Sequence, residues 1–258
     1  MPKVAAVQFT PVFKDKIGNL RRSARLVMAA AEKGAALIVL PELAHEGYSF
    51  MNKAEAEPFA EQLVDDPHKG TSIVEANRSM DVMRALAKRY GVYIAWGLVE
   101  KDPGTGALYN TQVLMGPDTL YESYRKVNRY SSDYLWSRPG RGNPPVMKCT
   151  LDGKTKKVGL LICRDVRDKK DDHWDSFYEK GDAELVAFSA NWGKGGFPAN
   201  AWMDFVEENH VTLIVSNRCK EEIPNDFGYG GTCVIEPPDV IHCEGLVWGE
   251  DCIVYADL

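Results

Sequence analysis

A carboxylate, an ammonium group and a thiol each stand at or near the end of a short strand-like run in this chain. The run "LIVLPE" ends at Glu42, "YRKV" carries Lys126, and "GLLIC" ends at Cys163. Strand ends are where α/β proteins bind their ligands. A thiolate is a nucleophile, a carboxylate can move protons, and an ammonium group can stabilise a developing anion. Together these side chains would suffice for nucleophilic catalysis, if the fold brings them into one site.

Each of these residues also has an ordinary structural interpretation when taken alone. Glu42 follows Pro41 and could be a turn carboxylate, and Lys126 lies in the basic run "YRKVNR", where a solvated lysine is the usual case. Cys163 is equally compatible with a structural and a catalytic role. Its position is informative, because an inert cysteine packs inside an apolar run, whereas here four charged residues follow within five positions.

The composition excludes several classes of protein. The chain has 258 residues, of which 45% are hydrophobic and 26% charged, as in a globular protein. Its net charge of -6 argues against nucleic acid as a partner, which needs a basic face. No apolar run approaches the roughly 18 residues of a membrane span, so we expect no membrane partner. The opening "MPKVAAVQFTP" resembles a strand and not a secretory leader, which predicts a cytoplasmic protein.

The six cysteines are scattered and form no C-x-x-C motif. With no export signal, we expect free thiols in a reducing cytosol and not disulfides. They are Cys149, Cys163, Cys219, Cys233, Cys243 and Cys252.

The spacing of apolar residues predicts alternating strands and helices in the first part of the chain. We expect strands over 3–9 and 36–42, and helices over 19–34 and 71–91. Asn19 is a plausible N-cap for the first helix. The second begins with an S-x-x-E capping box made by Ser72 and Glu75.

The middle and end of the chain add further strands. Adjacent strands over 92–127 with a turn at "DPGTG" predict antiparallel hairpins, whereas the first two β-α units predict parallel pairing. Helices are expected near 173–180 and over 198–210. We find no repeat and no linker, and predict a single domain over 1–258. The pattern indicates mixed sheets with helices outside, and helices on one side only would bury two sheets against each other.

Three motifs in this order resemble the nitrilase superfamily of carbon–nitrogen hydrolases, which use a Glu–Lys–Cys triad. "LPELAHEGY" resembles the glutamate motif, "YRKVN" the lysine motif and "ICRDVRD" the cysteine motif. Weaker likenesses extend over essentially the whole chain: "VAAVQF", "YNTQVLMGPD", "FSANW", "VEENHVTLIVSNR" and "GGTCVIEPPDVI". The resemblance implies an α/β fold, a four-layer α-β-β-α sandwich of two mixed sheets with helices outside.

The resemblance also implies roles for the triad. Cys163 would attack an amide carbon and form a thioester, and Glu42 would take the thiol proton, protonate the leaving group and then activate water. Lys126 and the backbone N–H of Arg164 would form the oxyanion hole. The ammonium is also expected to lower the pKa of the thiol. No cofactor and no metal is implied.

Two departures from the family pattern concern the site. The family's second glutamate lies six residues before the proline of a Pro-Gly pair, and here that position holds Asp133, one methylene shorter. Either Asp133 substitutes for it, or the alignment slips and Asp133 is a loop residue. Arg164 replaces the usual aromatic or small residue after the cysteine. Asp165 and Arg167 match the amidase-like branch, and we expect them to pair with each other or with neighbours in the turn.

For the substrate pocket we predict Tyr48, Asn191 and Trp192, which lie close to motif positions. Nothing in the sequence selects Arg138 or Lys194 as a holder of a substrate carboxylate. The absence of Trp-Glu after the cysteine points to a small amide, with a nitrile or an N-carbamoyl amino acid as alternatives. Relatives commonly continue beyond the position of Leu258 with a tail that packs across a dimer. We expect a homodimer even without this tail, and leave larger assemblies open.

Two other classes of function compete with this interpretation. Glu42 and His45 have the E-x-x-H spacing of di-iron helices, and "DDHWD" at 171–175 offers further ligands, but the surrounding run is strand-like and no zinc spacing is present. The departures at Asp133 and after Cys163 would also suit a catalytically silent binding or scaffold protein on the same fold.

Overall fold

The computed structural model describes residues 1–258 except 64–77, 168–181, 194–195, 221, 226 and 228–229. Its first sheet has the strand order β12-β1-β2-β3-β4-β5. Within it β1, β2 and β3 are parallel, and β12, β4 and β5 pair antiparallel with their neighbours. The strands are β1 (Lys3–Gln8), β2 (Ala35–Val39), β3 (Tyr93–Lys101), β4 (Leu108–Met115), β5 (Tyr121–Arg125) and β12 (Cys252–Asp257).

The second sheet repeats this plan, with the order β11-β10-β9-β8-β7-β6. Its parallel strands are β7, β8 and β9, flanked by antiparallel β6 on one side and β10 and β11 on the other. The strands are β6 (Val146–Leu151), β7 (Lys154–Ile162), β8 (Leu185–Ala190), β9 (Thr212–Asn217), β10 (Cys233–Glu236) and β11 (Val240–His242).

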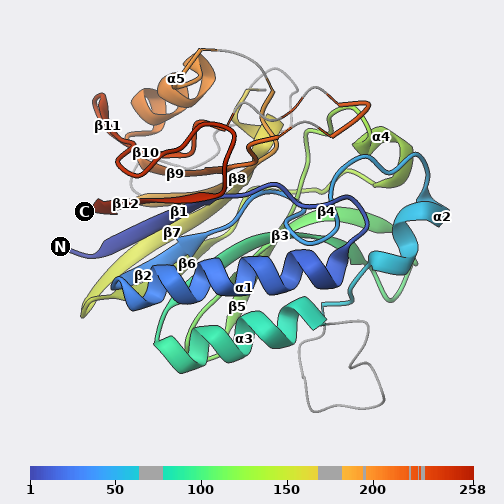
Figure 1. Ribbon diagram of the computed structural model, residues 1–258, viewed down its shortest axis with the longest axis horizontal. Helices are drawn as coiled ribbons and strands as arrows, with labels where there is room; N and C mark the ends of the chain where they lie inside the picture. The colour runs from blue at the N-terminus through green and yellow to red at the C-terminus, as the bar shows by residue number, and fades with distance from the viewer. Residues whose placement is uncertain (64–77, 168–181, 194–195, 221, 226, 228–229) are drawn as a thin grey trace.

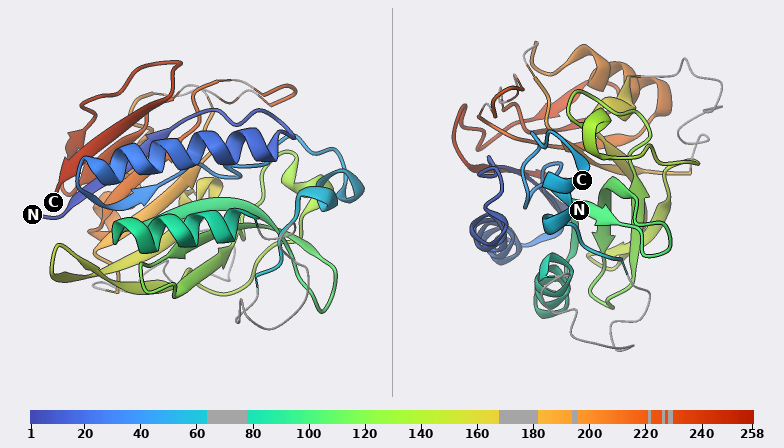
Figure 2. Two further views of the ribbon diagram at one scale, coloured as in Figure 1. Left: turned by 60° about the horizontal axis from the view of Figure 1, so that its bottom comes forward. Right: turned by 90° about the vertical axis from the view of Figure 1, so that its right-hand side faces the viewer.

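The two sheets face each other and helices cover their outer faces (Figures 1 and 2). Helices α1 (Lys16–Glu32) and α3 (Arg78–Tyr90) lie on the first sheet, and α5 (Asn200–Asn209) lies on the second. Shorter helical turns are α2 (Lys53–Ala56), α4 (Asp133–Trp136), Glu57–Phe59 and Cys163–Val166. This confirms the predicted four-layer α-β-β-α architecture.

The first sheet is buried on both faces, and the alternating residues of β1 show this. In β1, Val4 and Ala6 belong to the core between the sheets, whereas Ala5 and Val7 pack against the helices. Successive side chains of a strand point to opposite faces, so a strand covered on both sides must be apolar throughout. That requirement is why "KVAAVQF" shows no polar alternation.

The helix boundaries differ from the sequence prediction at the first helix. Helix α1 starts at Lys16, and the side chain of Asp15 caps it by accepting from the N–H of Gly18. Asn19 lies one turn inside the helix and is buried, and its amide donates to the carbonyls of Val12 and His45. The prediction of Asn19 as the cap was therefore wrong, because this residue instead ties the helix to two loops.

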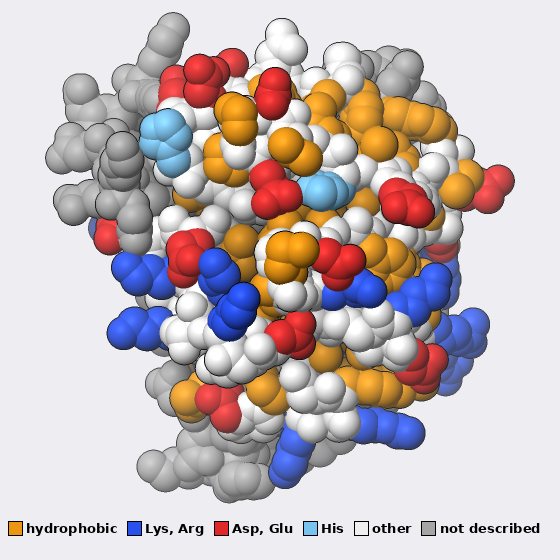
Figure 3. Space-filling view, turned by 90° about the vertical axis from the view of Figure 1, so that its left-hand side faces the viewer, with side chains coloured by type: hydrophobic (Ala, Val, Ile, Leu, Met, Phe, Trp, Pro, Cys, Tyr) orange, Lys and Arg blue, Asp and Glu red, His pale blue; other side chains and the backbone are white. Residues whose placement is uncertain are grey.

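Two predicted features lie outside the described residues. The capping box at Ser72 and Glu75 falls in 64–77, and the expected helix near 173–180 falls in 168–181. Among the described helices, none is long and apolar enough to cross a membrane. The face that bears both termini shows acidic, basic and hydrophobic side chains interspersed (Figure 3).

Candidate active site

The predicted residues follow strands at one end of the sandwich. Glu42 comes shortly after β2 of the first sheet, and Cys163 directly follows β7 of the second. Asn191 directly follows β8, and its side-chain amide donates to the backbone carbonyl of Glu42 at 3.1 Å. The carboxyl ends of parallel strands in the two sheets therefore meet at one place, as expected for a ligand site.

A closed hydrogen-bond network surrounds Lys126, just beyond β5. Its Nζ lies 2.7 Å from Glu42 Oε1 and 2.7 Å from Asp133 Oδ2. Asn110 of β4 completes the ring, because its Nδ2 donates to Glu42 Oε1 at 2.7 Å and to Asp133 Oδ1 at 3.1 Å. All four side chains are buried. Buried charges require such partners, and each one here has them.

Asp133 reaches the lysine in spite of its short side chain. It is the first residue of α4, and its Oδ2 also accepts from the backbone N–H of Tyr130 at 3.1 Å. The short helix carries the backbone toward the ammonium. Of the two alternatives left open by the sequence, the geometry agrees with the one in which Asp133 occupies the position of the second carboxylate.

Glu42 retains one oxygen that can act on a substrate. Its Oε1 is occupied by Lys126 and Asn110, whereas Oε2 has no hydrogen-bond partner among the described residues. Burial raises the pKa of Glu42, Lys126 opposes this shift and the charge of Asp133 reinforces it. A carboxylate with a raised pKa is a stronger base than an exposed one.

Cys163 sits at a turn in an unusual backbone conformation. Its φ is 41°, the left-handed region that costs a non-glycine residue roughly 1–3 kcal/mol, and its side chain is 5% exposed. Burial and the neighbouring Glu42 raise the pKa of the thiol, whereas Lys126 and the backbone N–H of Asn191 lower it. The lowering expected from the ammonium is therefore present, but the net shift of the pKa is upward. The lysine does favour the thiolate, but desolvation outweighs it in the closed site.

A pocket of about 250 Å³ opens beside the thiol. The guanidinium of Arg167 lies 4.3 Å from the ring centre of Trp192, and that of Arg164 lies 5.8 Å from the ring centre of Tyr130. None of the described lining residues is acidic, so both charged groups in the wall are cations. The lining residues are Tyr130, Cys163, Arg164, Arg167, Asn191, Trp192 and Gly193.

The predicted pocket residues divide between this wall and the layer behind it. Asn191 and Trp192 line the pocket, and the N–H of Trp192 is held by Asn217 Oδ1 at 2.7 Å. Tyr48 does not line it. Its hydroxyl donates to the carbonyl of Tyr130, and its ring centre lies 5.6 Å from Lys126 Nζ. Substrate contact by Tyr48 thus stays a prediction.

Sequence reasoning missed two polar residues that hold the loops around the site. Glu222 Oε1 accepts from the N–H groups of Tyr48 and Ser49. The amide of Asn225 donates to Ser49 Oγ at 2.8 Å and to Ser132 Oγ at 3.2 Å. Both lie far along the chain from the triad, and nothing in their local sequence marks them.

Two other residues were missed although a signal existed. Asn110 lies in "YNTQVLMGPD", which was quoted only as a family likeness. Asp165 was expected to pair within its turn, but its Oδ1 accepts from the N–H of Asn128 at 2.7 Å, which ties the cysteine turn to the lysine segment. Burial raises the pKa of Asp165 to about 7. Arg167 stacks on Trp192 and does not pair with Asp165 in the described contacts.

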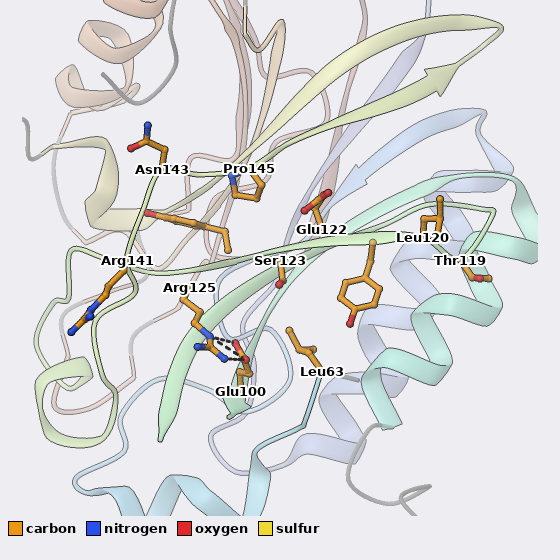
Figure 4. Close-up of a pocket in the computed structure, with 12 residues that line it drawn as sticks. Leu63, Glu100, Thr119, Leu120, Glu122, Ser123, Arg125, Arg141, Asn143 and Pro145 are labelled. Carbon is orange, nitrogen blue, oxygen red and sulfur yellow. Dashed lines mark hydrogen bonds and ion pairs between the residues drawn. The ribbon is translucent and has the colours of Figure 1, made fainter. Parts of the chain in front are cut away.

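A larger hollow of about 650 Å³ lies along β5, away from the triad (Figure 4). Its most prominent cation, Arg125, points to Glu100 and is paired with Glu100 and Asp102. Neither Glu42, Lys126 nor Cys163 lines this hollow. Size alone would favour it as the site, but the thiol that could act as a nucleophile lines the smaller pocket.

His45 does not combine with Glu42 into a metal site. Its Nε2 lies 3.0 Å from Ser23 Oγ in α1, and burial lowers its pKa to about 3. Within the described part of the chain, no group of three or more His, Cys, Asp or Glu side chains is arranged to hold a metal ion. The "DDHWD" segment lies outside the described residues.

Comparison with known proteins gives consistent matches. Residues 3–258 match the family model described as carbon-nitrogen hydrolase. A nitrilase of Pyrococcus abyssi is 33% identical over 86% of this chain and 77% of its own length. An ω-amidase of Danio rerio is 28% identical over 99% of this chain and 87% of its own.

Solved structures match the fold along the whole chain. An example is a glutamate-to-glutamine variant of an amidase from Nesterenkonia sp., in which acrylamide has added to the active-site cysteine. It covers 100% of this chain and 93% of its own, with a TM-score of 0.77 and 21% identity. At this identity the likeness establishes the fold.

Proposed function

The chain belongs to the carbon–nitrogen hydrolase family, and we propose that it hydrolyses small amides through a thioester on Cys163. The observation that carries this proposal is that Glu42 and Lys126, which pair at the end of the first sheet, lie near Cys163, which follows a strand of the second sheet and lines the pocket. The pKa of the thiol responds to both Glu42 and Lys126, so the three groups are close enough to interact.

In the first half of the reaction, Glu42 Oε2 takes the proton of the Cys163 thiol as the sulfur attacks the amide carbon. A C–S bond forms and the carbonyl oxygen becomes an oxyanion beside Lys126 Nζ and the N–H of Arg164. Such donors contribute roughly 3–4 kcal/mol each to transition-state stabilisation. Glu42 then gives its proton to the amide nitrogen, the C–N bond breaks, and ammonia or an amine leaves.

In the second half, Glu42 removes a proton from water and the resulting hydroxide attacks the thioester. The C–S bond breaks, the acid is released, and the proton returns to the thiolate. One carboxylate serves both halves because the proton transfers are sequential. The raised pKa values of Glu42 and Cys163 suit this scheme, since the resting thiol keeps its proton until a substrate arrives.

The pocket wall supports a finer proposal, that the amide carries an anionic group. Arg164 and Arg167 line the pocket, and the planar guanidinium group of Arg167 lies over the ring of Trp192, 4.3 Å from its centre. Guanidinium groups bind carboxylates in a bidentate geometry. The similarity to ω-amidases supports a substrate with an acid at the end opposite the amide.

Three other functions are alternatives to the hydrolysis of small amides. A nitrile or an N-carbamoyl amino acid could react at the same thiol, and the similarity to a nitrilase supports the first. A catalytically silent scaffold would keep the fold without turnover. The burial of Lys126 between Glu42 and Asp133 favours catalysis, because a buried lysine with two carboxylates is costly to maintain without a use.

The test is ammonia release from a panel of short aliphatic amides, ω-amides of dicarboxylic acids, N-carbamoyl amino acids and matching nitriles. The Cys163→Ala protein is the blank. We expect release from the ω-amides, absent in the blank. Release from nitriles alone would replace the amide proposal. Release from no compound, together with slow alkylation of Cys163, would favour the silent scaffold.

A further inference from the structure

A polar cross-link runs through the apolar core directly beneath the active site. Gln112 of β4 is fully buried between the two sheets. Its Nε2 donates to Ser189 Oγ at 2.8 Å and to the carbonyl of Ala187 at 3.0 Å, both on β8 of the opposite sheet. Its Oε1 accepts from the N–H of Leu161 on β7 at 2.9 Å. The hydroxyl of Ser189 extends this series of hydrogen bonds back to the first sheet, because it donates to the carbonyl of Leu40 at 2.7 Å.

The ends of this cross-link lie next to the proposed catalytic groups. Leu161 is two residues before Cys163, and Leu40 is two residues before Glu42. Ser189 stands two residues before Asn191, which itself bonds to the carbonyl of Glu42. The nucleophile and its base come from different sheets, so a device that couples these strand ends sets the distance between them.

The local strand geometry explains why a glutamine can do this. The ladder between β6 and β7 ends at the pair Val146 and Gly159, so Leu161 lies past it and its N–H is taken up by Gln112. Gln112 and Asn110 are two apart on one strand and share its inward face. Asn110 therefore bonds to Glu42 in the active site, whereas Gln112 bonds to β7 and β8 of the opposite sheet.

We propose that Gln112, with Ser189, is a positioning residue that fixes where the Cys163 thiol and the Glu42 carboxylate lie relative to each other across the two sheets. The inference rests on the proposed function. Buried amides that satisfy all their partners hold neighbours in one arrangement, whereas apolar packing between sheets tolerates sliding. A displacement of about 1 Å at a reacting group can cost about 100-fold in rate.

The experiment measures alkylation of Cys163 by chloroacetamide at neutral pH, followed by mass spectrometry of the peptide. We expect Gln112→Leu to slow this reaction about 10-fold, because the carboxylate is then no longer fixed in the position from which it takes the thiol proton. In a Glu42→Gln background, already slow, the same change should slow it less than about twofold. This non-additivity is the signature of two residues that act on one step. An equal factor in both backgrounds, or no effect in either, would overturn the proposal.

Two further variants keep the test independent of folding. Ser189→Ala removes only the hydroxyl in the middle of the chain and should slow alkylation in the same direction. Ser216→Ala is the matched control, because Ser216 also bonds across the sheets, to the carbonyl of Val7, but not next to Glu42 or Cys163. It should lower the melting temperature as Ser189→Ala does and leave the alkylation rate unchanged. A loss of rate in the control would mean that the effect is general loosening of the sandwich.

The same experiment separates this proposal from the proposed function. Failure of the proposed function appears in the unsubstituted protein, as a Cys163 that reacts no faster than the other cysteines or that ignores Glu42→Gln. Failure of the positioning role alone appears as a fast, Glu42-dependent Cys163 that is indifferent to Gln112→Leu and Ser189→Ala.

Discussion

The two sheets repeat one strand plan, yet their ends contribute different things to the site. The first sheet brings Glu42, Asn110 and Lys126, which with Asp133 form a closed ring of hydrogen bonds. The second sheet brings Cys163 and much of the pocket wall. One side is thus a buried charge network, and the other is a thiol at an opening.

This division of labour has an electrostatic reason. Interactions between charges are strongest where water is excluded, so the two carboxylates and the ammonium group belong on the closed side. The nucleophile must meet a substrate, so it belongs on the side with the pocket. The upward pKa shift of Cys163 follows from its position at the border, where the thiol is desolvated and where Lys126 is shared with two carboxylates.

Removal of the thiol from the second sheet should have the largest effect on turnover. We expect Cys163→Ala to lower amide turnover by at least about four orders of magnitude, because no other group can form the thioester. The closed network lies on the other sheet and should be unaffected, so the melting temperature should stay close to that of the unsubstituted protein. Turnover by the purified variant would show that the second sheet does not supply the nucleophile.

Removal of the Lys126 ammonium group tests the buried charge network of the first sheet. Lys126→Ala should reduce turnover by roughly 10³-fold through loss of the oxyanion contact. Unlike the cysteine variant, it should also lower the free energy of unfolding, by about 3–5 kcal/mol, because it leaves buried Glu42 and Asp133 without a counter-charge. Denaturant unfolding of both variants in parallel tests the contrast, and equal stability of the two would contradict it.

A smaller change sharpens the role of the second carboxylate. Asp133→Asn should lower turnover about 10-fold, since the amide still reaches Lys126 but no longer compensates its charge. The charge of Asp133 raises the pKa of Glu42, so its removal should lower that pKa. The acidic limb of the kcat/KM profile would then move to lower pH. A limb that stays in place or moves upward would mean that Asp133 does not act on the base.

The sequence predicted the strand ends well and the contacts between distant loops poorly. Glu42 and Cys163 follow apolar runs and Lys126 follows a strand, and these positions together with the three motifs made them candidates. Asn110 lies inside a strand, and the residues next to it in the sequence indicate only that the position is buried. Glu222 and Asn225 act on loops more than 80 residues away, and such pairing is decided by the packing of the two sheets. The direction of the Cys163 pKa shift likewise depends on burial, which a motif does not encode.

The loop that carries Glu42 holds a second buried carboxylate, which offers the mildest test. Glu46 is fully buried, and its Oε1 lies 3.1 Å from Lys16 Nζ. Burial raises the pKa of Glu46 to about 7. Because the folded state holds this proton more tightly than the unfolded chain, the stabilisation is complete below the unfolded value near 4.5 and is lost as the pH rises through about 7.

Glu46→Gln should therefore leave turnover nearly unchanged and flatten the dependence of stability on pH. Between pH 5 and pH 8 the unsubstituted protein should lose about 2–3 kcal/mol of unfolding free energy through this group. Asp165, whose pKa is also raised to about 7, should preserve part of the slope in the variant. Glu207→Gln, on the exposed face of α5, is the control and should keep the full slope. If Glu46→Gln instead reduced turnover as strongly as Asp133→Asn, the chemistry of the closed side would extend beyond the ring around Lys126.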